Sequence, residues 1–300
     1  MMKRPSNPAQ DFSEALARFE ALRARDDETI HELSGSRLWS HGHATPRAVL
    51  YLHGYTDSVQ QFARLGDLLF AQGFNVFAPR LPHHGHLDRM HHAHAELTTD
   101  ELLEWTNEAA DIARGFGESL TVMGLSLGGV LATWVAEQRA DVERALILAP
   151  AYGTSLIPPR FTHAAAHLFK RLPNLFMWWD ARVRAQAGFE YTYPRFATHA
   201  LAHMFLLSRE LLEHARKHAP AARTVWMITN ANDFAVSNKI CRAFVAAWRA
   251  HNTNQIFTYE FPRELGLPHD LMDPADPLVK PDVVYPRLLE MIQQEVHATR

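Results

Sequence analysis

The chain has 300 residues, of which 47% are hydrophobic and 21% charged, a balance typical of soluble globular proteins. Its formal net charge of −3 at pH 7 excludes the broad basic surface typical of nucleic-acid-binding proteins. The lone cysteine, Cys241, cannot form an internal disulfide bond, so the sequence implies no oxidising compartment.

Residues 1–44 are expected to form a helix and one or more leading strands ahead of the main fold. Lys3 and Arg4 are followed by no apolar segment, and Asp11 and Glu14 interrupt any candidate secretion signal. No stretch approaches the roughly 18 to 20 unbroken apolar residues that a membrane span needs. We therefore expect a cytoplasmic protein without stable membrane insertion.

Short, nearly continuous apolar runs recur along the chain and predict strands of a parallel sheet that is covered on both faces. Helical patterns separate the runs, and the clearest covers residues 100–116, where Thr98 and Glu101 form a capping-box start. This alternation predicts an open α/β fold with right-handed crossovers. The predicted strands are 48–54, 74–79, 119–126, 144–150, 224–229 and 255–261.

The interval 152–222 breaks this alternation because it is too long for a single crossover connection. It holds eleven aromatic residues in 71 positions, a higher share than the 10% of the whole chain. Such a segment has apolar surface to bury, so it is not a disordered loop. We interpret it as a mostly helical cap inserted between two core segments, 45–151 and 223–300.

The stretch VMGLSLGGV carries the strongest chemical signal, because residues 124–128 fit the pattern G-x-S-x-G. The pattern follows a predicted strand and precedes a predicted helix. In that context the serine stands on a sharp strand-to-helix turn, and the flanking glycines permit close packing. We predict that Ser126 is a nucleophile at the carboxyl edge of the sheet, near the positive end of the helix dipole.

Two later loops supply the partners that a serine nucleophile needs. Asp233 follows the fifth predicted strand and His269 follows the sixth, so both are expected at the same edge of the sheet as the serine. A serine hydroxyl needs a general base, and the base needs a carboxylate that orients it. We predict that His269 is the base and Asp233 its partner. Asp270 and Asp273 are less suitable because they adjoin the histidine in sequence.

The loop YLHGYTDS, after the first predicted parallel strand, is expected to complete the site. Gly54 lets the backbone turn so that the amide of Tyr55 can point inward, and the amide of Leu127 is the natural second donor of an oxyanion hole. We interpret His53 as a structural hydrogen-bond partner of this loop. No step of this chemistry uses a metal or a cofactor, so we expect neither.

These residues resemble the α/β-hydrolase superfamily, close to bacterial carboxylesterases and monoacylglycerol lipases. The resemblance covers about residues 45–295 and rests on HGYT, the P-x-x-HG loop, GLSLGG, Asp233 and His269. It implies hydrolysis of esters through an acyl-enzyme, with a helical cap over the site. His83 and Asn230 depart from the family pattern, since relatives commonly have glycine at both positions.

Six histidines fall between His83 and His94, which raises the question of a metal site. A zinc site needs three or four ligands in fixed geometry, whereas this run offers only i,i+3 pairs in a loop. The dipeptide His84-Gly85 also matches the HG turn of the family. We therefore predict a polar, titratable loop beside the active-site mouth and no metal.

The leading interpretation is a serine hydrolase that cleaves carboxylic esters with short-to-medium acyl chains. Phe176, Trp178 and Trp179 of the cap are expected to contribute to an apolar substrate pocket. The same triad also fits a prolyl-aminopeptidase-like peptidase, a thioesterase or an acyltransferase, and the fold also fits a non-catalytic ligand-binding protein. The expected partner is a small-molecule ester, and the sequence leaves open whether the chain forms a homo-oligomer.

Overall fold

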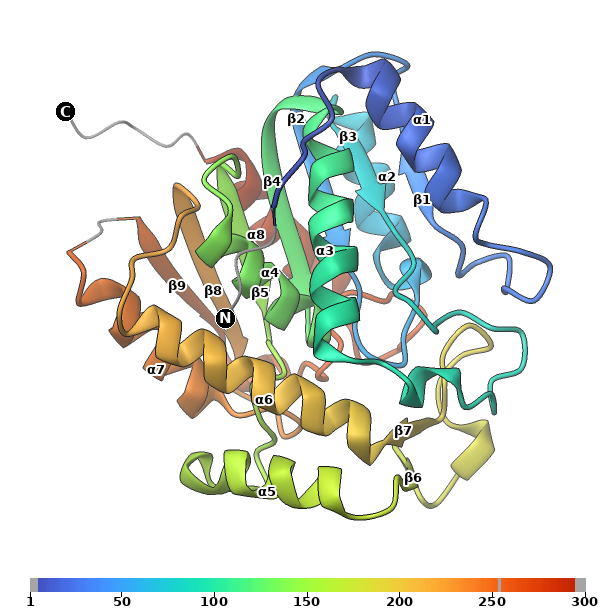
Figure 1. Ribbon diagram of the computed structural model, residues 1–300, viewed down its shortest axis with the longest axis vertical. Helices are drawn as coiled ribbons and strands as arrows, with labels where there is room; N and C mark the ends of the chain where they lie inside the picture. Colours follow the sequence, from blue (N-terminus) through green and yellow to red (C-terminus); the bar gives the residue numbers. More distant parts are fainter. Residues whose placement is uncertain (1–4, 253–254, 295–300) are drawn as a thin grey trace.

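The computed structural model of the protein describes residues 5–252 and 255–294. Its centre is a seven-stranded sheet, and a two-stranded antiparallel sheet lies apart from it (Figure 1). The strands of the large sheet are β1 (Arg37–Trp39), β2 (Thr45–Leu52), β3 (Asn75–Ala78), β4 (Gly117–Leu125), β5 (Arg144–Leu148), β8 (Thr224–Asn230) and β9 (Ile256–Phe261). The small sheet consists of β6 (Phe176–Trp178) and β7 (Arg195–Ala197).

The large sheet has the strand order β1-β3-β2-β4-β5-β8-β9. β1 pairs antiparallel with β3, and the other neighbouring strands pair in parallel. The central strands β4 and β5 are buried along most of their length, as expected for a sheet covered on both faces. All six predicted strands are present with boundaries within three residues of the prediction, and the α/β fold class is confirmed.

Helices cover both faces of the large sheet (Figure 1). They are α1 (Phe12–Arg23), α2 (Ala63–Ala71), α3 (Thr99–Arg114), α4 (Leu127–Gln138), α5 (Pro159–Arg171), α6 (Thr198–Ala215), α7 (Asn238–Arg249) and α8 (Pro281–Gln293). Short 3-10 helices are η1 (Val59–Phe62), η2 (Ala93–Ala95), η3 (Arg184–Gln186) and η4 (Arg263–Leu265). Within the described residues, no helix is both long and apolar enough to cross a bilayer.

The N-terminal boundary of α3 follows the predicted cap. The hydroxyl of Thr98 accepts a hydrogen bond from the amide of Glu101 at 3.2 Å, which satisfies one of the free amides of the first turn. The helix ends at Arg114, two residues earlier than the sequence pattern indicates. It packs against α1, α4 and β4, so its apolar face covers the centre of the sheet.

The interval 152–222 differs in detail from a mostly helical cap. It contains α5 and α6 but also the β6–β7 hairpin, which the sequence pattern did not predict. α6 packs against α5 and also against α4 and α7 of the sheet layer, and it buries Leu207, Leu211 and Ala215 along one face. α6 therefore serves as the crossover between β5 and β8, while α5 and the hairpin lie outside the main layers (Figure 1).

Candidate active site

Ser126 stands on the turn between β4 and α4 with φ 59° and ψ −115°, a backbone conformation that residues with a side chain rarely adopt. Two glycines let the turn pack this tightly. A Cβ atom on Gly124 would lie 2.0 Å from the carbonyl oxygen of Gly128, and one on Gly128 would lie 1.8 Å from that of Leu52. The turn places the serine at the carboxyl edge of the sheet, where its side chain is partly exposed.

The structure brings the three predicted triad residues together in one hydrogen-bonded chain. His269 Nε2 lies 3.0 Å from Ser126 Oγ, and His269 Nδ1 lies 2.7 Å from Asp233 Oδ2. The Asp233 carboxylate is inaccessible to solvent, and its second oxygen accepts hydrogen bonds from the amides of Ala235 and Val236. This is the geometry that a serine nucleophile, a base and an orienting acid require.

Two opposing effects act on the imidazole of His269. Burial lowers its pKa, whereas the charge of Asp233 and the hydrogen bond to it raise the pKa. The attraction outweighs the burial, so the pKa of His269 lies above its ordinary value. An imidazole with this shift readily accepts a proton from an attacking hydroxyl.

Asn230, at the end of β8, holds the loop that carries His269. Its buried Nδ2 donates to the carbonyl oxygens of Leu267 and Pro268 at 3.0 and 2.9 Å. Asn230 is not among the described residues with positive φ, so it does not imitate a glycine. Its side chain instead fixes the backbone just before the histidine. The only sequence signal for this role was its departure from the family pattern.

The two rival aspartates near His269 have other partners. Asp270 accepts a hydrogen bond from Gln61 Nε2 at 3.0 Å, and Asp273 accepts one from the hydroxyl of Tyr191 at 2.7 Å. Neither aspartate has a recorded hydrogen bond to the imidazole within the described ranges. The preference for Asp233 is therefore consistent with the geometry.

The peptide between Gly54 and Tyr55 lies against the nucleophile. A Cβ atom on Gly54 would be 3.6 Å from Ser126 Cβ. The carbonyl of Gly54 accepts hydrogen bonds from His53 Nδ1 at 2.9 Å and from the amide of Asp57 at 3.3 Å. In a trans peptide the N–H points opposite to the C=O, so these bonds set the direction of the Tyr55 amide.

The second predicted donor, the amide of Leu127, belongs to the first residue of α4. Amides in the first turn of a helix have no acceptor within the helix, and the role of this N–H as an oxyanion donor stays a prediction. It also lies at the positive end of the helix dipole. Leu127 itself is fully buried, which anchors the amide by packing of its side chain.

His53 and His84 hold the loop around Tyr55 from behind. His53 Nε2 accepts from the amide of Leu81 and His84 Nε2 accepts from the amide of Thr56, each at 3.0 Å. Burial lowers the pKa of both imidazoles, that of His53 to about 3. Each Nδ1 faces a carbonyl oxygen, which can only accept, so both rings are neutral with the proton on Nδ1.

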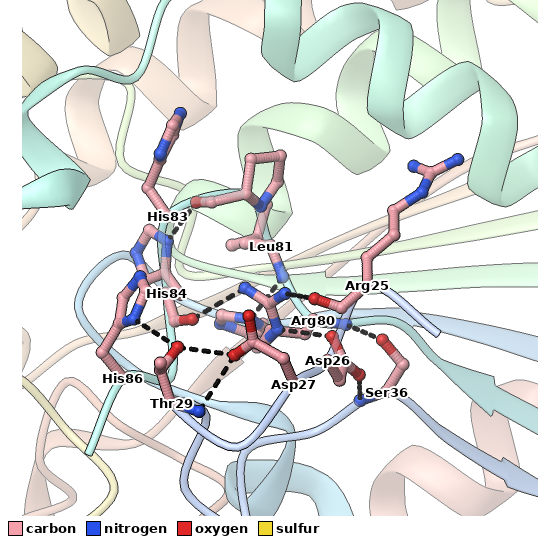
Figure 2. Close-up of polar contacts among 12 residues, drawn as sticks. Arg25, Asp26, Asp27, Thr29, Ser36, Arg80, Leu81, His83, His84 and His86 are labelled. Atoms are coloured by element: carbon pink, nitrogen blue, oxygen red, sulfur yellow. Dashed lines mark hydrogen bonds and ion pairs between the residues drawn. The ribbon is translucent and has the colours of Figure 1, made fainter. Parts of the chain in front are cut away.

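The turn that carries His84 has its own support (Figure 2). Arg80 donates to the carbonyl of His84 at 2.9 Å and forms a mostly buried ion pair with Asp26 at 2.7 Å. His83 adopts φ 61°, the left-handed region that explains why relatives place glycine there. Gly85 follows with φ 78°.

The prediction of a titratable histidine loop is wrong for two of its six members. His84 and His94 are buried, and burial lowers the pKa of both, that of His94 to about 4. The ring of His94 stacks on Tyr193 with 4.8 Å between centroids and packs edge-on against Tyr55. A loop pattern does not reveal which side chains turn inward; His84 serves as a neutral hydrogen-bond partner of Thr56, and His94 packs among aromatic rings.

Of the three predicted pocket residues, Trp179 is hydrogen-bonded to the loop around Tyr55. Its Nε1 donates to the hydroxyl of Thr56 at 2.8 Å, while about half of the side chain (49%) stays exposed. Phe176 and Trp178 instead lie beneath the guanidinium of Arg195, at 5.0 and 5.5 Å from its carbon. A role of all three in substrate binding stays a prediction.

Sequence reasoning missed a further link between the β6–β7 hairpin and the loop around Tyr55. The hydroxyl of Tyr55 accepts a hydrogen bond from the amide of Ala197 at 3.1 Å, and the amide of Tyr193 donates to the carbonyl of Thr56 at 2.8 Å. The β7 end of the hairpin is thus docked on Tyr55 and Thr56.

Comparison with known proteins places the chain in an established family of α/β-hydrolases. It belongs to the Hydrolase_4 family, described as serine aminopeptidase, S33, whose model matches residues 44–260. A thermostable monoacylglycerol lipase of Bacillus sp. (strain H-257) is 31% identical over 103 residues, which cover 32% of this chain and 38% of the relative. The chain therefore matches well under half the length of that curated relative.

Solved structures share the fold over most of the chain. The monoacylglycerol lipase of Paleococcus ferrophilus superimposes with a TM-score of 0.65 at 19% identity, covering 86% of this chain and 97% of that chain. A structure described with the metagenome-derived lipolytic enzymes LipS and LipT gives a TM-score of 0.62 at 19% identity, covering 89% of this chain and 100% of that chain. At this identity the likeness shows the fold.

Proposed function

We propose that the protein is a serine hydrolase that cleaves carboxylic esters with short-to-medium acyl chains. The observation that carries the proposal is the continuous chain of hydrogen bonds from Ser126 through His269 to Asp233. The likeness to lipolytic relatives supports an ester rather than another acyl compound.

In the proposed reaction, Ser126 Oγ attacks the acyl carbon while His269 Nε2 takes the hydroxyl proton. The negative charge that develops on the carbonyl oxygen is held by the amides of Tyr55 and Leu127. His269 then gives the proton to the leaving alcohol, and the acyl group stays on the serine. Water attacks the acyl-enzyme, His269 accepts its proton, and the acid departs as the proton returns to Ser126.

Asp233 contributes through the histidine. It accepts the Nδ1 hydrogen bond at 2.7 Å, which keeps the proton on Nδ1 and directs the Nε2 lone pair to the serine. Its negative charge also stabilises the imidazolium that forms when Ser126 loses its proton.

A peptidase is the second candidate because the family is described as a serine aminopeptidase family. The two functions separate in a panel of nitrophenyl esters of increasing acyl length, measured beside aminoacyl amides and thioesters. Each buried methylene contributes about 0.8 kcal/mol, so kcat/KM should rise several-fold per two carbons until the apolar pocket is filled. A profile that is flat with chain length, or faster turnover of aminoacyl amides, would favour the peptidase.

The pH dependence of kcat/KM should report the protonation of His269. The reaction needs its neutral form, so kcat/KM should rise with pH and reach its plateau above the raised pKa of His269. Asp233→Asn removes the charge that raises this pKa, and the rise should move to lower pH. Asp282→Asn, at the exposed start of α8, is the matched control and should leave the profile in place. A profile that does not move in Asp233→Asn contradicts the assignment.

A further inference from the structure

Gln61, on the short helix η1, uses every hydrogen-bonding position of its side-chain amide. Its Oε1 accepts from the hydroxyl of Tyr51 at 2.6 Å and from the amide of Gly54 at 3.2 Å. Its Nε2 donates to Asp57 Oδ2 at 2.6 Å and to Asp270 Oδ2 at 3.0 Å. An amide has two donors and two acceptor sites, so this buried group is saturated.

These four bonds join two loops that are distant in sequence. Gly54 and Asp57 flank the Tyr55 amide that is proposed to hold the oxyanion, while Asp270 directly follows the proposed base, His269. Gln61 and Asp270 are 209 positions apart in the chain. The single side chain of Gln61 therefore links the oxyanion loop to the histidine loop.

The carboxyl groups of Asp57 and Asp270, which both accept hydrogen bonds from Gln61, cannot both carry a charge at low cost. Asp57 Oδ2 and Asp270 Oδ2 accept hydrogen bonds from the same nitrogen, Gln61 Nε2, so the two oxygens lie close to each other. Their other oxygens already accept amide hydrogen bonds, from Ser58 at 2.8 Å and from Met272 at 2.7 Å. Two negative charges at this separation repel strongly, which favours protonation of one carboxyl group. The proton then fits between the two Oδ2 atoms, because the Oδ1 atoms already accept amide hydrogen bonds.

The surroundings favour the protonated pair. Burial is the largest cause of the raised pKa of each carboxyl, and at Asp57 the charge of Asp270 adds to it. Asp273 also faces the pair and raises the pKa of Asp57 further. The pKa values of Tyr51, Tyr191 and Tyr285, which surround the aspartates, are raised as well.

Hydrogen bonds and one charge act in the opposite direction. At Asp270 the hydrogen bonds from the side chain of Gln61 and from the amides of Met272 and Asp273 lower the pKa. A positive charge on His269 favours the ionised form of Asp270, although the net shift of the pKa of Asp270 is upward. The pair therefore faces tyrosines and a third carboxyl on most sides, and the histidine of the proposed triad on one.

We propose that Gln61 is a positioning residue, which clamps Asp57 and Asp270 as a pair sharing one proton and thereby holds the oxyanion loop and the histidine loop together. The effect of the clamp on turnover rests on the proposed function, whereas the shared proton stands independently of it. Loss of the clamp should lower kcat, because the Tyr55 amide and His269 would no longer be held in one geometry.

The shared proton is tested by infrared spectroscopy of the whole protein at neutral pH. The parent should show the C=O stretching band of a protonated carboxyl group, shifted in heavy water. Asp57→Asn and Asp270→Asn should each weaken or shift this band, because the remaining carboxyl no longer shares a proton with the charged partner beside it. Asp276→Asn, in the exposed turn after Asp273, is the matched control and should keep it. Parent and variant spectra that coincide would overturn the pair.

The positioning role is tested by kinetics on the ester panel. Gln61→Met keeps the length of the side chain but removes all four hydrogen bonds, and kcat should fall on the order of 10- to 100-fold with little change in KM. Gln60→Met, one residue earlier on η1, is the matched control and should stay close to the parent.

Asp270→Asn covers the case in which Gln61→Met does not fold. The amide of Met272 keeps the oxygen of the new side chain in place, so its Nδ2 must meet Gln61 Nε2, and two donors repel. Its kcat should also fall on the order of tenfold at constant KM. Unchanged kcat in the folded variants, or an equal loss in Gln60→Met, would overturn the role. If the parent hydrolyses no ester, the infrared result alone still decides the shared proton.

Discussion

Ser126→Ala is expected to abolish ester hydrolysis and to leave the fold intact. The Ser126 hydroxyl is the proposed nucleophile. Within the described residues, its side chain forms a hydrogen bond with His269. Alanine adopts the same φ of 59° at no greater cost than serine, so the elbow should persist. The checks are nitrophenyl ester turnover and a thermal unfolding curve. Ser13→Ala, on the exposed surface of α1, is the matched control.

The other two residues of the proposed triad, Asp233 and His269, should act together with Ser126 as one catalytic unit. Asp233→Asn and His269→Ala are each expected to lose on the order of 10³-fold or more in turnover. Double variants should lose little further, since the residual rate comes from substrate binding and the oxyanion hole. Turnover near the parental rate in Ser126→Ala would end the serine-hydrolase proposal, and additive losses in the double variants would contradict a shared mechanism.

Gly128→Ala is expected to cause a large loss of stability. The new Cβ would lie 1.8 Å from the carbonyl oxygen of Leu52 and 2.5 Å from its carbon. These are backbone atoms of β2 in the buried centre of the sheet, so they cannot move aside as a flexible side chain would. α4 would have to shift away from the sheet, which also displaces Ser126.

The cost should be about 3 kcal/mol or more, a large share of the roughly 5 to 15 kcal/mol by which such domains are stable. Chemical denaturation monitored by circular dichroism measures it. In Gly35→Ala, the matched control, the nearest heavy atom to the new methyl would be Asp26 Oδ2 at 3.5 Å, an ordinary contact. That variant should stay within about 0.5 kcal/mol of the parent. A parental midpoint for Gly128→Ala would contradict the packing argument.

The histidine-rich segment shows how a residue count can mislead. Six histidines in a loop suggested a titratable surface, yet His84 and His94 lie in the interior with lowered pKa values. His84 holds the amide of Thr56 and so supports the loop that carries the proposed oxyanion donor, Tyr55. Loop residues have no fixed periodicity, so their exposure depends on the chain segments that fold against them.

The sequence by itself determined the sheet, the serine elbow and the order of Ser126, Asp233 and His269. Each of these depends on a few contiguous residues, because apolar runs predict strands and the strand-to-helix turn admits a narrow set of residues. Since parallel strands end at one edge of a sheet, the placement of the two partners followed from the predicted strand order.

Only the tertiary structure decided which side chains support that site. Asn230 on the carbonyls of Leu267 and Pro268, and Gln61 across to Asp270, join segments that are 37 or more positions apart. The β6–β7 hairpin and the inward turn of His94 likewise have no local signal. Such contacts depend on how separate loops meet after the sheet has formed, and side-chain hydrogen bonds are sensitive to displacements well under the length of one residue.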